Sequence, residues 1–234
     1  MMDSQKIIFI SLALLLSQSA FAAMGDEPLV FQLKADELET DDSGNNLLEW
    51  NAQAWAGGDL NKLWLKTEGE RHDGETEALE VQVLYSKAIA AYWDLQAGIR
   101  HDAKPSPEQN WAVVGLQGLA PYFFETEAAL FINSDGDAAV RFSTEYEMLF
   151  TQRLILSPEL ELNLYAQDIP ELGIGSGLSN ISAGLRLRYE IRREFAPYIG
   201  VHWKEYYGDT VDFLSTDGEE ISETSLVFGL RFWF

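Results

Sequence analysis

Every second residue at the carboxyl-terminal end of this chain is large and apolar. The series consists of Leu226, Phe228, Leu230, Phe232 and Phe234. The residues between them are Ser225, Val227, Gly229, Arg231 and Trp233. Because successive side chains of a β-strand point to opposite sides, this period of two predicts a strand with one apolar and one polar face. Such a face covers a soluble core or meets lipid, and an alternating final strand that ends in an aromatic residue is also how outer-membrane barrels close.

The same alternation continues along the chain from residue 29, without a convincing helical period. In residues 79–85, for example, one face carries Leu79, Val81, Val83 and Tyr85. Clusters of Gly, Asp, Asn and Ser separate the alternating segments and are typical of turns. Counting the segments predicts an all-β chain of about twelve antiparallel strands.

Periodicity by itself leaves two folds open. A soluble β-sandwich or a secreted lipocalin-like barrel would turn the apolar side chains inward, whereas a transmembrane barrel would turn them to lipid. Three observations favour the membrane: aromatic residues gather near strand ends, the strands have about ten residues or more, and short connections alternate with longer ones. We therefore expect an outer-membrane antiparallel β-barrel of about twelve strands. Residues 23–234 would form this single domain.

The amino-terminal end predicts export. Lys6 precedes an apolar run over residues 7–16, and Ala20 and Ala22 supply the small residues of a cleavage site. Residues 1–22 are therefore a predicted signal peptide, cleaved after Ala22. The apolar run is too short to span a bilayer as a helix. These features place the predicted barrel in the outer membrane of a double-membraned bacterium.

An even number of strands returns the chain to the side where it began, so both ends of the barrel are expected in the periplasm. The expected periplasmic turns lie around Gly58, Ala90, Ala120, Thr151 and Phe195. The outer connections, expected to be mostly longer, lie around Asp73, Pro105, Asp135, Gly175 and Asp217. The longest, over residues 204–223, is acidic.

The net charge of -22, from 38 acidic and 16 basic residues, argues against nucleic acid as a partner, because phosphate binding needs a cationic surface. Cations are better-matched partners than nucleic acid for a chain with this negative charge. The expected inward side chains are Glu49, Glu68, Glu80, Asp94, Glu125, Glu127, Glu145, Glu147, Glu159, Glu161, Glu190, Lys66, Arg100, Arg141, Arg186, Arg188 and Arg231. Two interpretations stay open: a path that attracts cations, or a lattice of ion pairs that only stabilises the barrel.

Catalysis has little support in the sequence. The chain contains no cysteine, and its three histidines are His72, His101 and His202. The first two lie at or beside expected loops, and His202 has no evident nucleophile near it. No HxxxH-like pair concentrates metal ligands. We expect a protein that is not an enzyme.

Two parts of the chain resemble the copper resistance protein B family of outer-membrane proteins. Residues 50–70, WNAQAWAGGDLNKLWLKTEGE, resemble the family's opening strand, its Gly-Gly-Asp turn and its Lys-Thr-Glu-Gly-Glu end. The second half resembles the family through TQRLIL at residues 151–156, the segment at residues 159–203 and the closing FGLRFWF. The resemblance implies an outer-membrane barrel that takes part in copper tolerance by binding copper or passing it across the outer membrane. Many family members carry a Met- and His-rich tract before the barrel, where this chain has AMGDEPL at residues 23–29.

On this resemblance the expected ligand is a copper ion, without a catalytic role. Because the Met- and His-rich tract is missing, carboxylates and scattered imidazoles are the available ligands, and they suit Cu(II) better than Cu(I). A cation entering from outside would pass the acidic loop of residues 209–220 and reach carboxylates in the upper lumen. The expected metal ligands are His101, His202, Glu68, Asp94 and Glu145, with His72 a poorer candidate. The alternative function is a narrow non-metal channel or a structural barrel.

The other expected partners follow from the barrel and the resemblance. They are outer-membrane lipid, the barrel assembly machinery and periplasmic copper proteins. The expected membrane-assembly signal consists of Phe228, Phe232 and Phe234.

Overall fold

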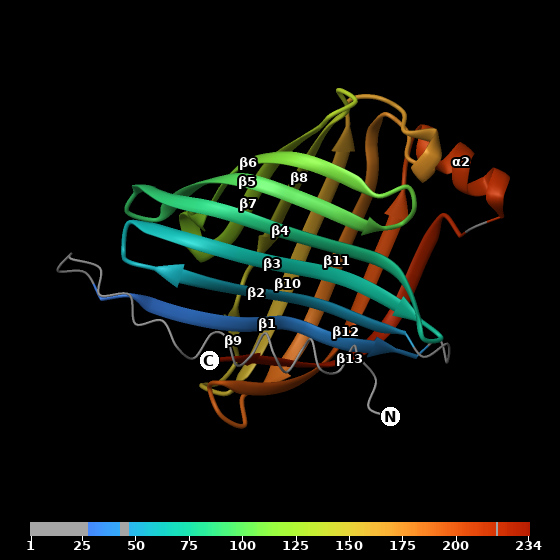
Figure 1. The fold of residues 1–234 in the computed structure, drawn as a ribbon. Coiled ribbons are helices and arrows are strands. Elements are labelled where there is room, and N and C mark those ends of the chain that lie inside the picture. Colours follow the sequence, from blue (N-terminus) through green and yellow to red (C-terminus); the bar gives the residue numbers. More distant parts are fainter. Residues whose placement is uncertain (1–27, 43–46, 219) are drawn as a thin grey trace, which may run out of the picture.

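The computed structural model describes residues 28–42, 47–218 and 220–234, and the predicted signal peptide at residues 1–22 lies outside them. The described chain forms one antiparallel sheet that curves round and closes on itself (Figure 1). Its strands are β1 (Val30–Asp41), β2 (Leu48–Gly57), β3 (Asn61–His72), β4 (Glu75–Ala90), β5 (Trp93–Lys104), β6 (Gln109–Ala120), β7 (Phe124–Asn133), β8 (Ala138–Glu145), β9 (Met148–Leu149), β10 (Leu154–Tyr165), β11 (Gly177–Tyr189), β12 (Phe195–Tyr206) and β13 (Ser222–Trp233). The connections contain the 3-10 helices η1 (Pro121–Phe123) and η2 (Pro170–Leu172) and the helix α2 (Asp209–Asp217). No helix among the described residues is long and apolar enough to cross a membrane.

β8 and β9 are two parts of one barrel strand. Both pair with β10, and the N–H of Tyr146 between them donates to the Pro158 carbonyl at 3.0 Å. The 13 labelled strands of the described chain therefore build twelve strands of the barrel. Because β1 pairs with β13 and β10 pairs with β11, the sheet closes without an open edge. The predicted barrel of about twelve strands is confirmed.

The two faces of the sheet are polarised opposite to those of a soluble barrel. Leu63 is 57% exposed and Ile99 is 64% exposed, and both point outward. Lys66, Glu80 and Arg186 point inward and are buried. A soluble barrel would bury its apolar side chains and expose its charges, so the arrangement excludes the secreted soluble barrel and fits an outer surface in contact with lipid.

Leu185 tests this orientation, because it lies within β11 on the outer face and is 46% exposed. The Leu185→Arg substitution should lower the free energy of unfolding by about 2 to 4 kcal/mol, since a charge near the middle of the bilayer loses its hydration. The matched control is Tyr189→Arg, on the same face at the end of β11, where the cost should fall to about 0 to 1 kcal/mol. Urea unfolding in lipid vesicles measures both. Equal losses at the two positions would contradict a lipid-facing Leu185.

The barrel closes at a seam between β1 and β13. The ladder is interrupted between Ala35 and Glu39, so the pairs at its two ends hold the seam. Beside the carboxyl terminus, the Phe234 N–H donates to the Leu33 carbonyl at 2.8 Å, and the Leu33 N–H donates to the Phe234 carbonyl at 2.9 Å. The three predicted assembly residues lie on or directly after β13 and are partly exposed: Phe228, Phe232 and Phe234. The ring centroids of Phe232 and Phe234 are 6.0 Å apart.

The two ends of the barrel differ in their connections (Figure 1). We call the end where β1 begins and β13 ends the terminal end, and the opposite end the loop end. All connections at the terminal end are short, as predicted. At the loop end only 42–47, 166–176 and 207–221 are longer, so the expectation of mostly long outer connections is only half right. Asp73 and Gly74, for example, join β3 to β4 directly, with φ angles of 47° and 91° that suit a two-residue hairpin turn.

The connection at 207–221 contains α2, although the sequence showed no helical period. A helix of 9 residues is too short to display a clear period in an acidic segment. Thr210 anchors α2 over the loop end, because its buried hydroxyl accepts a hydrogen bond from the Gly175 N–H at 2.9 Å and donates one to the Ser179 hydroxyl at 3.1 Å. The acidic segment is therefore held against the mouth of the barrel (Figure 1).

Candidate cation path

The lumen of the barrel contains two large cavities. One has a volume of about 480 Å³ and lies at the loop end, where α2 contributes to its lining. The other has a volume of about 370 Å³ and lies toward the terminal end. Six residues line both cavities: Glu37, Asn51, Glu68, Arg141, Glu159 and Glu161. We call these six residues the constriction, because they lie on the walls of both cavities.

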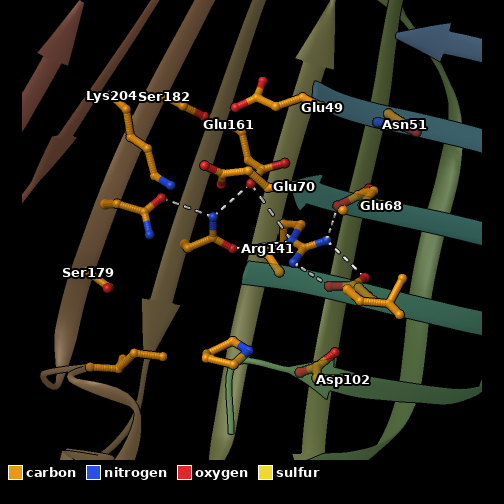
Figure 2. Close-up of a pocket in the computed structure, with 18 of the residues that line it drawn as sticks. Glu49, Asn51, Glu68, Glu70, Asp102, Arg141, Glu161, Ser179, Ser182 and Lys204 are labelled. Atoms are coloured by element: carbon orange, nitrogen blue, oxygen red, sulfur yellow. Dashed lines mark hydrogen bonds and ion pairs between the residues drawn. The ribbon is translucent and has the colours of Figure 1, made fainter. Parts of the chain in front are cut away.

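Arg141 on β8 is the central cation of the constriction. Its guanidinium nitrogens lie 2.9 Å from a Glu80 oxygen, 3.2 Å from a Glu68 oxygen and 3.9 Å from a Glu161 oxygen. The three carboxylates come from β3, β4 and β10, and Figure 2 shows two of them, Glu68 and Glu161, with Arg141. The Phe131 ring lies 5.6 Å from the guanidinium carbon. Arg141 thus connects β8 to strands on another part of the wall and lines both cavities.

Arg186 on β11 forms a second ion-pair centre. Its nitrogens lie 2.8 Å from a Glu37 oxygen, 2.9 Å from a Glu39 oxygen and 2.7 Å from a Glu159 oxygen. The Tyr198 hydroxyl also donates to Glu39 at 2.9 Å. Together with Arg141, Arg186 leaves each constriction glutamate within 3.9 Å of an arginine nitrogen. Each constriction glutamate therefore has an arginine partner, although the carboxylates around Arg141 and Arg186 outnumber these two arginines.

Glu37 and Glu39 were absent from the predicted inward set. A register shift between Ala35 and Glu37 in the β1–β2 ladder places an extra residue, Asp36, in β1. Such a bulge reverses the faces of the residues that follow it. The adjacent acids Asp36 and Glu37 were the available signal, because two neighbouring charges break the alternation.

One part of the lumen is apolar, which the alternation of the strands did not predict. The buried cluster consists of Leu84, Trp111, Val113, Ala129, Phe131, Ala139 and Ile169. Leu172 and Ile174, from the connection at 166–176, pack against it. The segment 111–116, WAVVGL, has apolar residues at odd and at even positions, so both faces of this strand are apolar. This pattern was the available signal for a strand that is buried on both faces. Arg100 lies against this cluster, with its guanidinium carbon 4.8 Å from the centre of the Phe131 ring.

The structure distributes the three predicted carboxylate ligands over different depths. Glu68 lies at the constriction. Asp94 and Glu145 lie toward the terminal end, because β5 begins there and β8 runs toward it, so their expected place in the upper lumen is wrong. Asp94 accepts from the Lys62 ammonium at 3.0 Å, and Glu145 lies 3.4 Å from an Arg231 nitrogen. All three carboxylates therefore pair with basic side chains, and a metal role for them stays a prediction.

The two preferred histidines lie on opposite faces of the sheet. His202 lines the loop-end cavity. His101 follows the inward Arg100 on β5, so it points outward, and its Nδ1 lies 2.9 Å from the Asn110 side-chain oxygen on β6. The His202 imidazole therefore points into the lumen and the His101 imidazole points to the outside of the barrel. A metal site in the lumen that uses both imidazoles is ruled out.

His72, the less favoured histidine, lies in a cluster of possible metal ligands. One ligand atom from each of Glu70, His72 and Glu77 lies within 4.8 Å of the other two. We call these three residues the rim trio, since β3 and β4 meet there at the loop end. Figure 2 shows Glu70 on the wall of the loop-end cavity, which it also lines.

Comparison with known proteins places these features in context. The family model described as copper resistance protein B precursor matches residues 29–234. Copper resistance protein B of Escherichia coli is 47% identical over 213 residues, which cover 91% of this chain and 72% of that protein. A copper resistance protein B homolog of Pseudomonas syringae pv. tomato is 47% identical over 201 residues, covering 86% of this chain and 68% of that protein. The solved structure of the NanC porin covers 87% of this chain and 99% of its own with a TM-score of 0.55 and 13% identity, a likeness in fold alone.

Proposed function

The chain belongs to the copper resistance protein B family, and from this premise we propose that it binds copper ions and passes them across the outer membrane through its acidic lumen. Family membership gives the chain a role in copper resistance. The barrel assembly machinery would insert the protein among outer-membrane lipids, with the loop end outside the cell. Periplasmic copper proteins would receive the ion at the terminal end.

The observation that carries this proposal is the sequence of charged groups along the lumen. The acidic α2 lies at the mouth, followed by Glu49, Glu70 and His202 in the loop-end cavity. The constriction follows, and Glu125 and Glu127 line the cavity beyond it. Carboxylates in walls of low dielectric attract cations strongly, so these groups would raise the local cation concentration along this path.

The ligand chemistry of the path suits Cu(II). Carboxylate oxygens and the His202 imidazole are its anionic and nitrogen donors, and Cu(II) binds such N/O sites more tightly than other divalent first-row metals. At the constriction a divalent cation would compete with Arg141 for Glu68 and Glu161. The guanidinium carries one positive charge and the metal carries two. The carboxylates can therefore exchange one cation for the other without becoming buried, unpaired charges.

A structural barrel or a narrow non-metal channel is the alternative, and a specific observation favours it. The constriction glutamates all pair with arginines, which is the arrangement of a stabilising lattice. In both functions the protein is not an enzyme. Among the described residues, His72 and His101 pair with Glu77 and Asn110 respectively, and neither of these partners is a hydroxyl nucleophile.

Copper uptake into vesicles distinguishes the two functions. Purified protein is reconstituted into liposomes that contain a copper-chelating dye, and Cu(II) is added outside. The proposal expects faster dye response than in empty liposomes, and a slower response for Glu68→Gln. Glu147→Gln is the matched control, because it neutralises an inward carboxylate that lines neither large cavity and is not an expected metal ligand. Uptake equal to that of empty liposomes, or equal rates for Cu(II), Ca(II) and Mg(II), would support the alternative.

A further inference from the structure

The rim trio owes its geometry to a bulge next to a tight turn. The β3–β4 ladder pairs Glu70 with Ala78 but Arg71 with Thr76, so Glu77 is an extra residue in β4. A bulge re-aims its extra side chain. Here it brings a Glu77 oxygen to 3.8 Å from the His72 Nδ1.

The adjacent turn is held in place by a side chain. Arg71 donates two hydrogen bonds to the Gly74 carbonyl, at 2.9 and 2.7 Å, and so braces the two-residue turn. The three potential ligands therefore sit on a short, hydrogen-bonded hairpin. Such a support reduces the loss of conformational freedom when a ligand binds.

The electrostatics of the rim trio differ from those of the constriction. In the constriction every glutamate has an arginine partner. Within the described part of the chain, no lysine or arginine nitrogen lies within ion-pair distance of Glu70 or Glu77, and His72 is the only basic group paired with either. Two neighbouring carboxylates repel each other, so a bound cation would remove an unfavourable interaction that Arg141 and Arg186 already remove in the lumen.

We propose that Glu70, His72 and Glu77 form a capture site for a divalent transition metal, with Cu(II) preferred. The trio offers one imidazole nitrogen and two carboxylate oxygens, and Cu(II) exceeds Ni(II) and Zn(II) in affinity for such donors. Metal–ligand bonds of about 2 Å place the ligand atoms of one ion about 3 to 4 Å apart. Side-chain rotation of Glu77, which is 57% exposed, can close the present separation, and water can complete the coordination.

The site would also connect the outside to the lumen. Glu70 both belongs to the trio and lines the loop-end cavity, so an ion held at the rim already touches the path. This capture step deepens the proposed function and rests on it for the identity of the cargo. Binding at the rim, however, can be measured without any passage through the barrel.

The test is electron paramagnetic resonance of the purified full-length mature barrel in detergent, titrated with Cu(II). We expect one equivalent of bound Cu(II) with nitrogen hyperfine structure. His72→Ala should remove the nitrogen signal, and His72→Ala and Glu77→Gln should each weaken binding by at least about 10- to 100-fold, because that loss already follows when a residue that only supports a metal ligand is removed. The matched controls are His101→Ala, which removes an imidazole near the same end, and Glu75→Gln, which neutralises a carboxylate of the same hairpin outside the trio. Heat modifiability on gels checks that each variant is folded.

The outcomes separate the capture site from copper passage. Unchanged nitrogen signal and affinity in both His72→Ala and Glu77→Gln would overturn the rim site, as would loss of the signal in His101→Ala alone. An absence of tight Cu(II) binding in the unmodified protein would overturn it as well. Vesicle uptake that persists in those cases would leave passage intact, whereas rim binding without uptake would refute passage alone.

Discussion

Replacing Arg141 by Ala should join the two lumen cavities and raise the cation conductance of the barrel. The substitution removes the guanidinium that contacts Glu68, Glu80 and Glu161 at the boundary of both cavities. Glu68 would then lack its ion-pair partner, and a mobile cation would occupy the position of the missing guanidinium. Breaking a buried ion pair on one side should also lower the free energy of unfolding by about 3 to 5 kcal/mol. Planar-bilayer recording and urea unfolding measure the two effects.

Arg231→Ala is the matched control for Arg141→Ala. Arg231 also pairs with carboxylates, Asp36, Glu145 and Glu147, but lines neither large cavity. It should therefore lower stability without raising conductance. If Arg141→Ala conducted no better than Arg231→Ala, Arg141 would not be the side chain that closes the lumen.

Deleting Phe234 should abolish most insertion into the outer membrane. The truncation removes the two backbone hydrogen bonds to Leu33 at the end of the interrupted seam, together with the terminal ring. Without these contacts β13 closes less firmly on β1, and an unclosed barrel exposes unpaired backbone groups that lipid cannot satisfy. The truncated chain should accumulate in the periplasm, which cell fractionation and heat modifiability on gels detect.

Phe234→Ala separates the two contributions of this residue. It keeps the backbone hydrogen bonds to Leu33 but removes the ring next to Phe232. A defect as severe as that of the truncation would assign recognition to the aromatic ring, in line with the predicted assembly signal. A normal amount of folded, membrane-inserted barrel from the truncated chain would refute both contributions.

Strand alternation was sufficient to predict the barrel and the direction of most side chains. The side-chain direction in a strand is set by the local backbone, so Glu68, Arg141 and Arg186 could be assigned to the lumen from their positions in the sequence. The polarity of the two faces, together with the export signal, then favoured a membrane barrel over a soluble one. Local departures from the strand pattern were harder to predict. The bulge at Asp36, the bulge at Glu77 and the helix α2 each occupy too few residues to establish a period.

The sequence alone could not predict how deep in the lumen each inward side chain lies or which side chain it pairs with. Asp94 and Glu145 share the inward direction of Glu68, yet strand direction places them nearer the terminal end. Glu39 meets Arg186 across 147 positions of the chain, a contact that exists only because β1 closes on β13. The number, tilt and stagger of all the strands together decide which inward side chains come level with one another. The sequence by itself determined an inside-out barrel with a charged lumen, since the period of two is a local property. Only the closed tertiary structure decided that Arg141 and Arg186 would pair with the constriction glutamates and that His72 would lie close to Glu70 and Glu77. Both arrangements depend on how the strands pair in register.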